Sequence, residues 1–161
     1  MNEVNANKSV KCQDGFFEVT DKNSEKYATC SQFGRWSFVP QCEECPKDGE
    51  VIRGFQFFSK KMTHQRASMF CSKRNASLVK IRETGKFMYI RSIIKTCNYK
   101  QLWTDGKKID DVWIYSDDHV VPQNDTYWNR YFHNNGMCLR IHHRFRGKSC
   151  NALLGYICEF L

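Results

Sequence analysis

Basic side chains occupy every second position between residues 140 and 148, and this spacing is the clearest sign of chemistry in the chain. They are Arg140, His142, Arg144, Arg146 and Lys148. If the stretch is a strand, these side chains share one face and the intervening ones face the core. The intervening residues are Leu139, Ile141, His143 and Phe145. Guanidinium groups match sulfate, phosphate and carboxylate well, so the pattern predicts an anion-binding surface. The competing interpretation is a solvated face that keeps a sheet edge soluble.

Catalytic and metal-binding patterns are missing from the sequence. It contains no Gly-x-Ser-x-Gly, no His-Glu-x-x-His and no P-loop, so we do not expect an enzyme. A zinc site would need a second pair beside Cys42-x-x-Cys45 or His142-His143, and none is present. Adjacent residues on a strand point to opposite faces, so the two histidines would chelate poorly together. We expect neither a metal nor a cofactor.

Composition favours an extracellular protein. The 161 residues contain nine cysteines, a density that reducing cytosol rarely tolerates without metal. No apolar run approaches the roughly 20 residues that span a bilayer, and the first residues do not resemble a signal peptide. Three glycosylation sequons fit secretion; they begin at Asn7, Asn75 and Asn124. We therefore expect a secreted protein or the extracellular part of a membrane protein.

The net charge of +8 is unevenly distributed. Residues 1–44 hold five Lys or Arg against seven Asp or Glu, and residues 45–161 hold twenty against ten. The basic character of the second part favours acidic partners. Nucleic acid is not expected, because the compartment is extracellular and the sequence shows no nucleic-acid-binding motif.

The C-terminal cysteines and the tryptophans follow a recognisable order. Cys138 and Cys150 precede Gly155-Tyr156-Ile157-Cys158-Glu159, with Cys71 far upstream and Trp103, Trp113 and Trp128 between. Residues 45–161 thereby resemble a C-type lectin-like domain. The resemblance implies an α+β fold with two helices, small antiparallel sheets and a long loop. It also implies the disulfides Cys71–Cys158 and Cys138–Cys150.

Residues 10–44 carry a second set of landmarks. Cys12-Gln13-Asp14-Gly15-Phe16 is followed by Cys30, by Gly34-Arg35-Trp36-Ser37 and by Pro40-Gln41-Cys42. They resemble the second half of a complement control protein (sushi) module, which is a small all-β unit. The resemblance implies a Cys12–Cys42 disulfide and leaves Cys30 without its usual partner. Residues 43–49 are polar and contain Pro and Gly, as in a short linker.

Three cysteines remain after these pairs: Cys30, Cys45 and Cys97. A Cys30–Cys45 bridge across the boundary is plausible, and Cys45–Cys97 competes with it. One cysteine is left over in either case, which is compatible with a disulfide-linked dimer, with a free thiol or with a truncated module.

Hydrophobic spacing predicts the main elements of the lectin-like part. A strand at 54–58 precedes a helix that begins after Thr63, a plausible N-cap. A second helix is expected over 84–95, with an apolar stripe of Phe87, Ile90, Ile93 and Ile94. Strands are expected at 102–106 and 113–117, and a long ordered loop over 118–135.

Calcium ligands of the sugar-binding relatives are replaced in this sequence. The resemblance aligns their acidic ligand with Phe132 and their proline with His133, and it aligns Trp-Asn-Asp-x-x-Cys with residues 145–150. Calcium needs six to eight oxygen ligands, whereas Arg146 would repel the ion. We therefore expect no calcium at this position, with Arg130 and His133 lying near the basic strand.

Two functions remain open. The first is calcium-independent recognition of an anionic ligand, either a sulfated glycan or an acidic protein surface. The second is a protein-binding adhesion or immune-modulating ectodomain that uses sushi contacts and aromatic side chains. The aromatic run is Tyr127, Trp128, Tyr131 and Phe132. We expect Trp128 to lie in the core, whereas Tyr131 and Phe132 are candidates for ligand contact.

Overall fold

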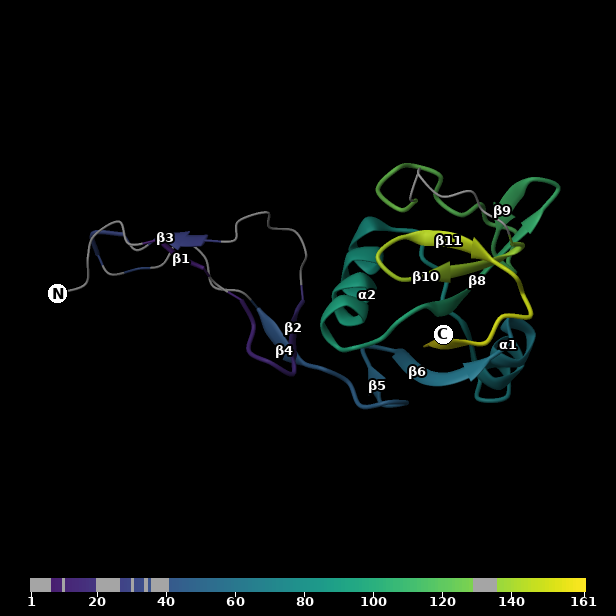
Figure 1. The fold of residues 1–161 in the computed structure, drawn as a ribbon, viewed down its shortest axis with the longest axis horizontal. Helices are drawn as coiled ribbons and strands as arrows, with labels where there is room; N and C mark the ends of the chain where they lie inside the picture. Colours follow the sequence, from purple (N-terminus) through teal and green to yellow (C-terminus); the bar gives the residue numbers. More distant parts are fainter. Residues whose placement is uncertain are drawn as a thin grey trace.

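The computed structural model describes residues 7–9, 11–19, 27–29, 31–33, 35, 41–128 and 136–161. Its largest element is an eight-stranded sheet in the order β11-β10-β8-β12-β6-β5, with β7 paired to β12 and β9 paired to β8. The strands are β5 (Val51–Ile52), β6 (Phe55–Met62), β7 (Ala76–Leu78), β8 (Leu102–Ile109), β9 (Val112–Ile114), β10 (Cys138–Ile141), β11 (Phe145–Lys148) and β12 (Leu154–Phe160). Figure 1 shows helices α1 and α2 on opposite sides of these strands.

The pairing differs in two respects from the small antiparallel sheets expected. The pairs join into one continuous sheet, and β12 runs parallel to β8 through Gly155 and Leu102 while the other pairs are antiparallel. Gly155 permits the close approach of β12 to both neighbours, because a Cβ there would collide with the carbonyl oxygen of Phe58 in β6 and with the side chain of Leu102 in β8. The glycine of the Gly-Tyr-Ile-Cys sequence is therefore required by packing.

Both predicted helices are present. Helix α1 (His64–Ser72) begins after Thr63, whose side chain accepts a hydrogen bond from the backbone N–H of Arg66 at 3.3 Å. Helix α2 (Thr84–Thr96) buries the predicted apolar stripe, because its four members are at most 1 % exposed. The N-cap at Thr63 located the first helix, and the 3.6-residue period of the apolar stripe located the second.

Buried side chains form two clusters on the sheet. The larger lies under α2 and contains Ile90, Phe145 and Trp128. The smaller surrounds Trp103, Tyr156 and the Cys71–Cys158 disulfide. Trp128 is 9 % exposed and its indole N–H donates to the carbonyl of Pro122 at 2.7 Å, which confirms that this ring belongs to the core.

Four disulfides join described cysteines within the chain. Three are those that the resemblances imply: Cys12–Cys42, Cys71–Cys158 and Cys138–Cys150. The fourth is Cys45–Cys97, so the Cys30–Cys45 bridge was the wrong alternative. Cys30 lies outside the described residues. A covalent dimer through Cys45 or Cys97 is therefore not compatible with this structure, while one through Cys30 stays a prediction.

The N-terminal part contains two short strand pairs. Strand β1 (Asn7–Ser9) pairs with β3 (Tyr27–Thr29), and β2 (Phe16–Glu18) pairs with β4 (Cys42–Glu44). Of the predicted sushi landmarks, Gly34, Trp36, Ser37 and Pro40 lie outside the described residues. The two strand pairs and one disulfide do not by themselves show a sushi module.

Strand β2 packs directly onto α2 of the lectin-like part. Phe17 is fully buried and its ring meets that of Tyr89 edge-on at 5.6 Å. The hydroxyl of Ser92 donates to the carbonyl of Glu18 at 2.6 Å. Residues 43–49, which were expected to form a linker, instead include part of β4 and the disulfide-bonded Cys45. The junction is a packed contact and not a loose tether.

No helix among the described residues is long and apolar enough to cross a membrane.

Candidate functional site

The basic run folds as a hairpin and not as the single strand predicted. Strands β10 and β11 pair antiparallel, and the chain reverses at residues 142–144, where the backbone N–H of His142 donates to the carbonyl of Arg144 at 3.3 Å. The disulfide gives the physical reason. A strand running from Cys138 to Cys150 would separate their Cα atoms by about 40 Å, whereas the disulfide holds them 5.1 Å apart. The implied disulfide was therefore the sequence signal for this turn.

The hairpin still gathers most of the predicted cations around one hollow. Arg140 lies directly opposite Arg146 in the strand pair. A hollow of about 230 Å³ is lined by Arg140, His142, His143, Arg144, Phe145 and Arg146. Lys148 does not line it, because this residue pairs with Cys138 at the far end of the hairpin. The structure thus groups four of the five predicted basic residues.

Arg140 is the unusual member of this group. It is only 8 % exposed, and its Nε atom is buried with no hydrogen-bond partner among the described residues. Burial, together with the neighbouring charge of Arg146, lowers the pKa of Arg140 to about 10. A buried cation without a compensating anion is costly to the fold. An anion entering the hollow would offset this cost.

The two adjacent histidines lie at the turn. Their ring centroids are 4.0 Å apart, because the residues are not on a strand and do not point to opposite faces. His143 is exposed and does not face the core, contrary to the prediction. Burial lowers the pKa of His142, and His143 and Arg140 lower it further. Among the described residues, no group of three His, Cys, Asp or Glu side chains is placed to hold a metal ion.

An aromatic cluster supports the hairpin from below. Phe145 is 1 % exposed and packs against the rings of Phe87, Tyr127 and Trp128 at 5.5 to 5.8 Å. The guanidinium of Arg144 donates to the carbonyl of Trp128 at 3.3 Å. Arg144 is therefore bound to a residue of the buried cluster on which the hairpin packs. The remaining predicted ligand residues, Arg130, Tyr131, Phe132 and His133, lie outside the described residues.

The predicted glycosylation sites have differing positions. Asn75 and Asn124 are exposed, as glycan attachment requires. Asn7 lies in β1, and its side chain is not described. Their modification stays a prediction.

The fold and the family are shown by comparison with known proteins. The lectin C-type domain family matches residues 60–160, so the chain belongs to this family. Human lithostathine is similar over 73 % of this chain and 90 % of its own, at 19 % identity and a TM-score of 0.58. The SPL-1–GlcNAc complex is similar over 71 % and 93 %, at 20 % identity and a TM-score of 0.57. A calcium-independent type II antifreeze protein is similar over 71 % and 92 %, at 20 % identity and a TM-score of 0.55.

A search of curated protein sequences finds no match. Since the similar structures are at most 20 % identical, they establish the fold alone. The chain is thus a carbohydrate-recognition-type domain of the C-type lectin kind, a class of binding modules whose disulfides fit an extracellular setting.

Proposed function

We propose that the chain is an extracellular recognition module that binds an anionic ligand through the hollow of the basic hairpin, without calcium. The observation that carries this proposal is Arg140, a nearly buried cation whose Nε atom has no hydrogen-bond partner among the described residues. Residues 138–149 contain no carboxylate. An incoming sulfate or carboxylate group would supply the missing acceptor.

The size of the hollow favours a compact anionic group. A volume of about 230 Å³ admits a sulfate together with several water molecules, since water takes up about 30 Å³ each in the liquid. Arg140 and Arg146 face each other across the strand pair, so their guanidinium groups can share one ligand. A sulfated glycan presents such groups repeatedly, and it is the ligand that we propose over an acidic protein patch.

Calcium fits this site poorly. Residues 146 and 147 align with oxygen ligands of the sugar-binding relatives, and here they are Arg and Gly. A guanidinium repels the ion and glycine supplies no side-chain oxygen, whereas calcium needs six to eight oxygen ligands. Similar structures include one antifreeze protein described as calcium-independent and one described as Ca2+-dependent, so the proposal depends on residues 146 and 147 and not on the fold.

Protein recognition is the second candidate function, and the packed junction favours it. Because Phe17 is buried against the lectin-like part, both parts of the chain can present one composite surface. We propose that residues 10–44 are a partial sushi module, supported by the Cys12–Cys42 disulfide and the β2–β4 pair. The chain would then be secreted or belong to the extracellular part of a membrane protein.

Heparin chromatography tests the first proposal. We expect the wild-type chain to elute above physiological salt and to lose affinity steeply as salt rises, because exposed charges are screened. The double reversal Arg144→Glu with Arg146→Glu should remove this retention. The matched control is Lys60→Glu with Lys61→Glu, which makes the same charge change at two exposed positions of β6.

The control variant should shift the elution only slightly. Equal loss of retention in both double variants would show that net charge and not the hairpin binds heparin. Elution of the wild type below physiological salt would contradict the glycan proposal. A partner protein whose binding changes little with salt would favour the second function.

A further inference from the structure

A second hollow, of about 260 Å³, opens between α1 and the hairpin formed by β8 and β9. It shares no lining residue with the hollow of the basic hairpin. Ile109 and Ile114 give it apolar walls, while His64 and Asp105 give it polar lining groups that are nearly buried. These residues come from separate elements, so their spacing in the sequence gave no sign of a site.

His64 lines this hollow and keeps one ring nitrogen without a hydrogen-bond partner among the described residues. The side chain is 2 % exposed, and its Nε2 lies 2.8 Å from the carbonyl oxygen of Thr104. A carbonyl only accepts, so Nε2 carries the ring proton. Burial and the nearby charge of Lys107 lower the pKa of His64, which keeps the ring neutral. Nδ1 is then an unprotonated acceptor, and it is buried without a partner among the described residues.

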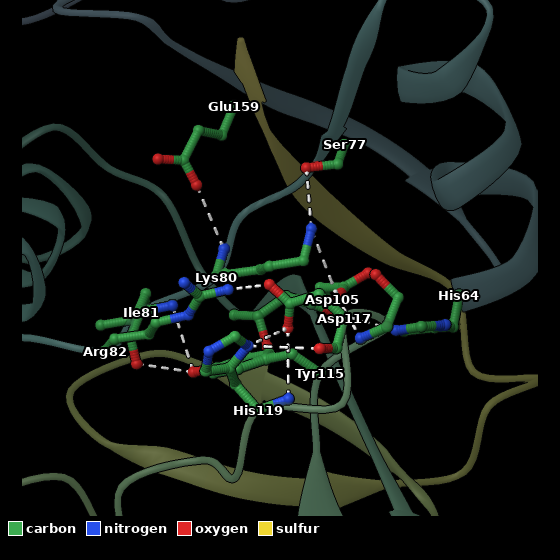
Figure 2. A network of polar contacts seen from close by, with 12 residues as sticks. His64, Ser77, Lys80, Ile81, Arg82, Asp105, Tyr115, Asp117, His119 and Glu159 are labelled. Atoms are coloured by element: carbon green, nitrogen blue, oxygen red, sulfur yellow. Dashed lines mark hydrogen bonds and ion pairs between the residues drawn. The ribbon is translucent and has the colours of Figure 1, made fainter. Parts of the chain in front are cut away.

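Asp105 provides a second acceptor. Its Oδ2 accepts a hydrogen bond from the backbone N–H of Ser116 at 2.7 Å and lies 3.7 Å from Nζ of Lys80 (Figure 2). Its Oδ1 receives no hydrogen bond from the described residues. Asp105 is 7 % exposed, so its carboxylate is nearly buried, and one of its two oxygens accepts no hydrogen bond from the described residues.

The surroundings of this hollow are acidic although the protein is basic. Residues 105–118 hold five Asp against two Lys, whereas the whole chain has a net charge of +8. Asp111 pairs with Lys108 and Asp117 pairs with Arg82. The exposed Asp118 lines the hollow and forms no ion pair with the described residues. Lys107 also lines the hollow, so its lining residues carry two carboxylates, Asp105 and Asp118, against one Lys. The remaining negative charge favours a cation.

We propose that this hollow binds a lysine side chain of a partner protein. The aliphatic stem lies against Ile109 and Ile114, and the ammonium group donates to Nδ1 of His64, Oδ1 of Asp105 and the carboxylate of Asp118. An ammonium group has three donors and no acceptor, which matches three acceptors without donors. Val112 and Val120, which are 45 % and 57 % exposed, extend the apolar surface beside the hollow for the partner backbone.

Nuclear magnetic resonance of the full chain tests this proposal with Nα-acetyl-lysine amide as the probe. We expect saturable shifts of the Ile109 and Ile114 methyl signals and of the His64 Nδ1 signal, with a dissociation constant of about 1 to 10 mM for a single side chain. Nα-acetyl-norleucine amide has the same stem without the charge and should give no saturable shift. Absence of shifts with the lysine probe, or an equal response to both probes, would overturn the proposal.

Two matched variants locate the binding. Asp118→Asn should weaken the lysine probe by about fivefold or more, because it removes a charge at the hollow. Asp111→Asn makes the same charge change at a residue paired with Lys108, and it should alter the affinity by less than about twofold. Equal weakening in the two variants would overturn the proposal. Retention on heparin should rise slightly and equally in both, which separates this hollow from the basic hairpin.

Discussion

The basic hairpin of β10 and β11 lies beside the hairpin of β8 and β9, because β8 pairs with β10 in the same sheet. We call the second one the acidic hairpin, since residues 105–118, which include its turn and the segment after β9, hold five Asp against two Lys. The two hairpins are built in opposite ways. The basic hairpin is clipped by Cys138–Cys150 and rests on the buried ring of Phe145. The acidic hairpin leaves Ile109 half exposed. The basic hairpin therefore carries exposed charged side chains on a well-packed support. The acidic hairpin presents exposed apolar side chains, with charged side chains next to them.

Each hairpin also keeps one nearly buried group without a partner among the described residues. In the basic hairpin it is a donor, Nε of Arg140, and beside the acidic hairpin it is an acceptor, Nδ1 of His64. Unpaired buried polar atoms are rare because they cost free energy. Nε of Arg140 and Nδ1 of His64 are two of five such atoms among the described residues, and they lie in differently charged surroundings, so the net charge of the chain does not describe each of its surfaces. On our proposals the two hairpins bind ligands of opposite sign.

The largest expected effect is a difference in how much one substitution in each hairpin lowers the free energy of unfolding. Phe145→Ala should lower the free energy of unfolding by about 3 to 5 kcal/mol, because it empties a packed aromatic cluster. Ile109→Ala should cost about 1 kcal/mol or less, since that side chain is half exposed. Urea denaturation of both variants measures the difference, and similar losses would contradict the contrast in packing.

A smaller effect on stability is expected at Arg140. Arg140→Met removes a buried charge and keeps much of the volume, so the free energy of unfolding should stay unchanged or rise by about 1 to 2 kcal/mol. Retention on heparin should fall in the same variant. A decrease of more than about 2 kcal/mol in the free energy of unfolding, measured by urea denaturation, would show that Arg140 stabilises the fold. It would contradict the view that this residue is kept for ligand binding.

Acidification should change the ligand affinities of the two hairpins in opposite directions. A bound anion favours protonated His142, so heparin affinity should rise between pH 7.5 and 5.5, by about tenfold if its pKa changes by one unit. Protonated His64 has no acceptor at Nδ1, so the lysine probe should bind more weakly over the same range. Titration at several pH values by calorimetry and by nuclear magnetic resonance measures both, and the same sign at both sites would contradict the comparison.

Stability without ligand should also depend on pH. The pKa values of His64 and His142 are lowered in the folded chain, so the unfolded chain binds more protons below about pH 6.5. The stability that these two neutral histidines contribute is fully present above the pKa of histidine in the unfolded chain. It is lost as the pH falls toward their lower pKa values in the folded chain. The melting temperature at pH 7.5 should therefore be higher than that at pH 5.5. A lower melting temperature at pH 7.5 would contradict the lowered pKa values of the two histidines.

The smallest expected effect is that of calcium. Melting curves with EDTA and with millimolar calcium should agree within about 1 °C, because Arg146 stands where an oxygen ligand is needed. A rise of several degrees with calcium would reveal a site, and it would contradict the view that the basic hairpin replaces metal with fixed cations.

Local patterns determined much of the fold. Thr63 marked the start of α1, and the 3.6-residue spacing of Phe87, Ile90 and Ile94 located α2 and its buried face. Cysteine order together with the family resemblance implied three disulfides that the structure contains. These features were readable because each depends on residues close in sequence or on a specific sequence pattern.

Other features were decided by contacts between distant residues. The partner of Cys45 depended on which segments meet, and Phe17 gave no local sign that it would join the core beneath α2. Alternation suggested one strand through residues 138–148, although the disulfide between positions 138 and 150 requires a reversal. The meeting of His64 with Asp105 likewise follows from the packing of α1 against β8.

The sequence by itself determined which charges and rings the chain carries, how its helices are spaced and which family it resembles. Only the tertiary structure decided which of these groups are buried without a partner among the described residues, Arg140 and His64 being two of them. The physical reason is that composition and period fix local conformation, whereas desolvation depends on every element that packs around a group.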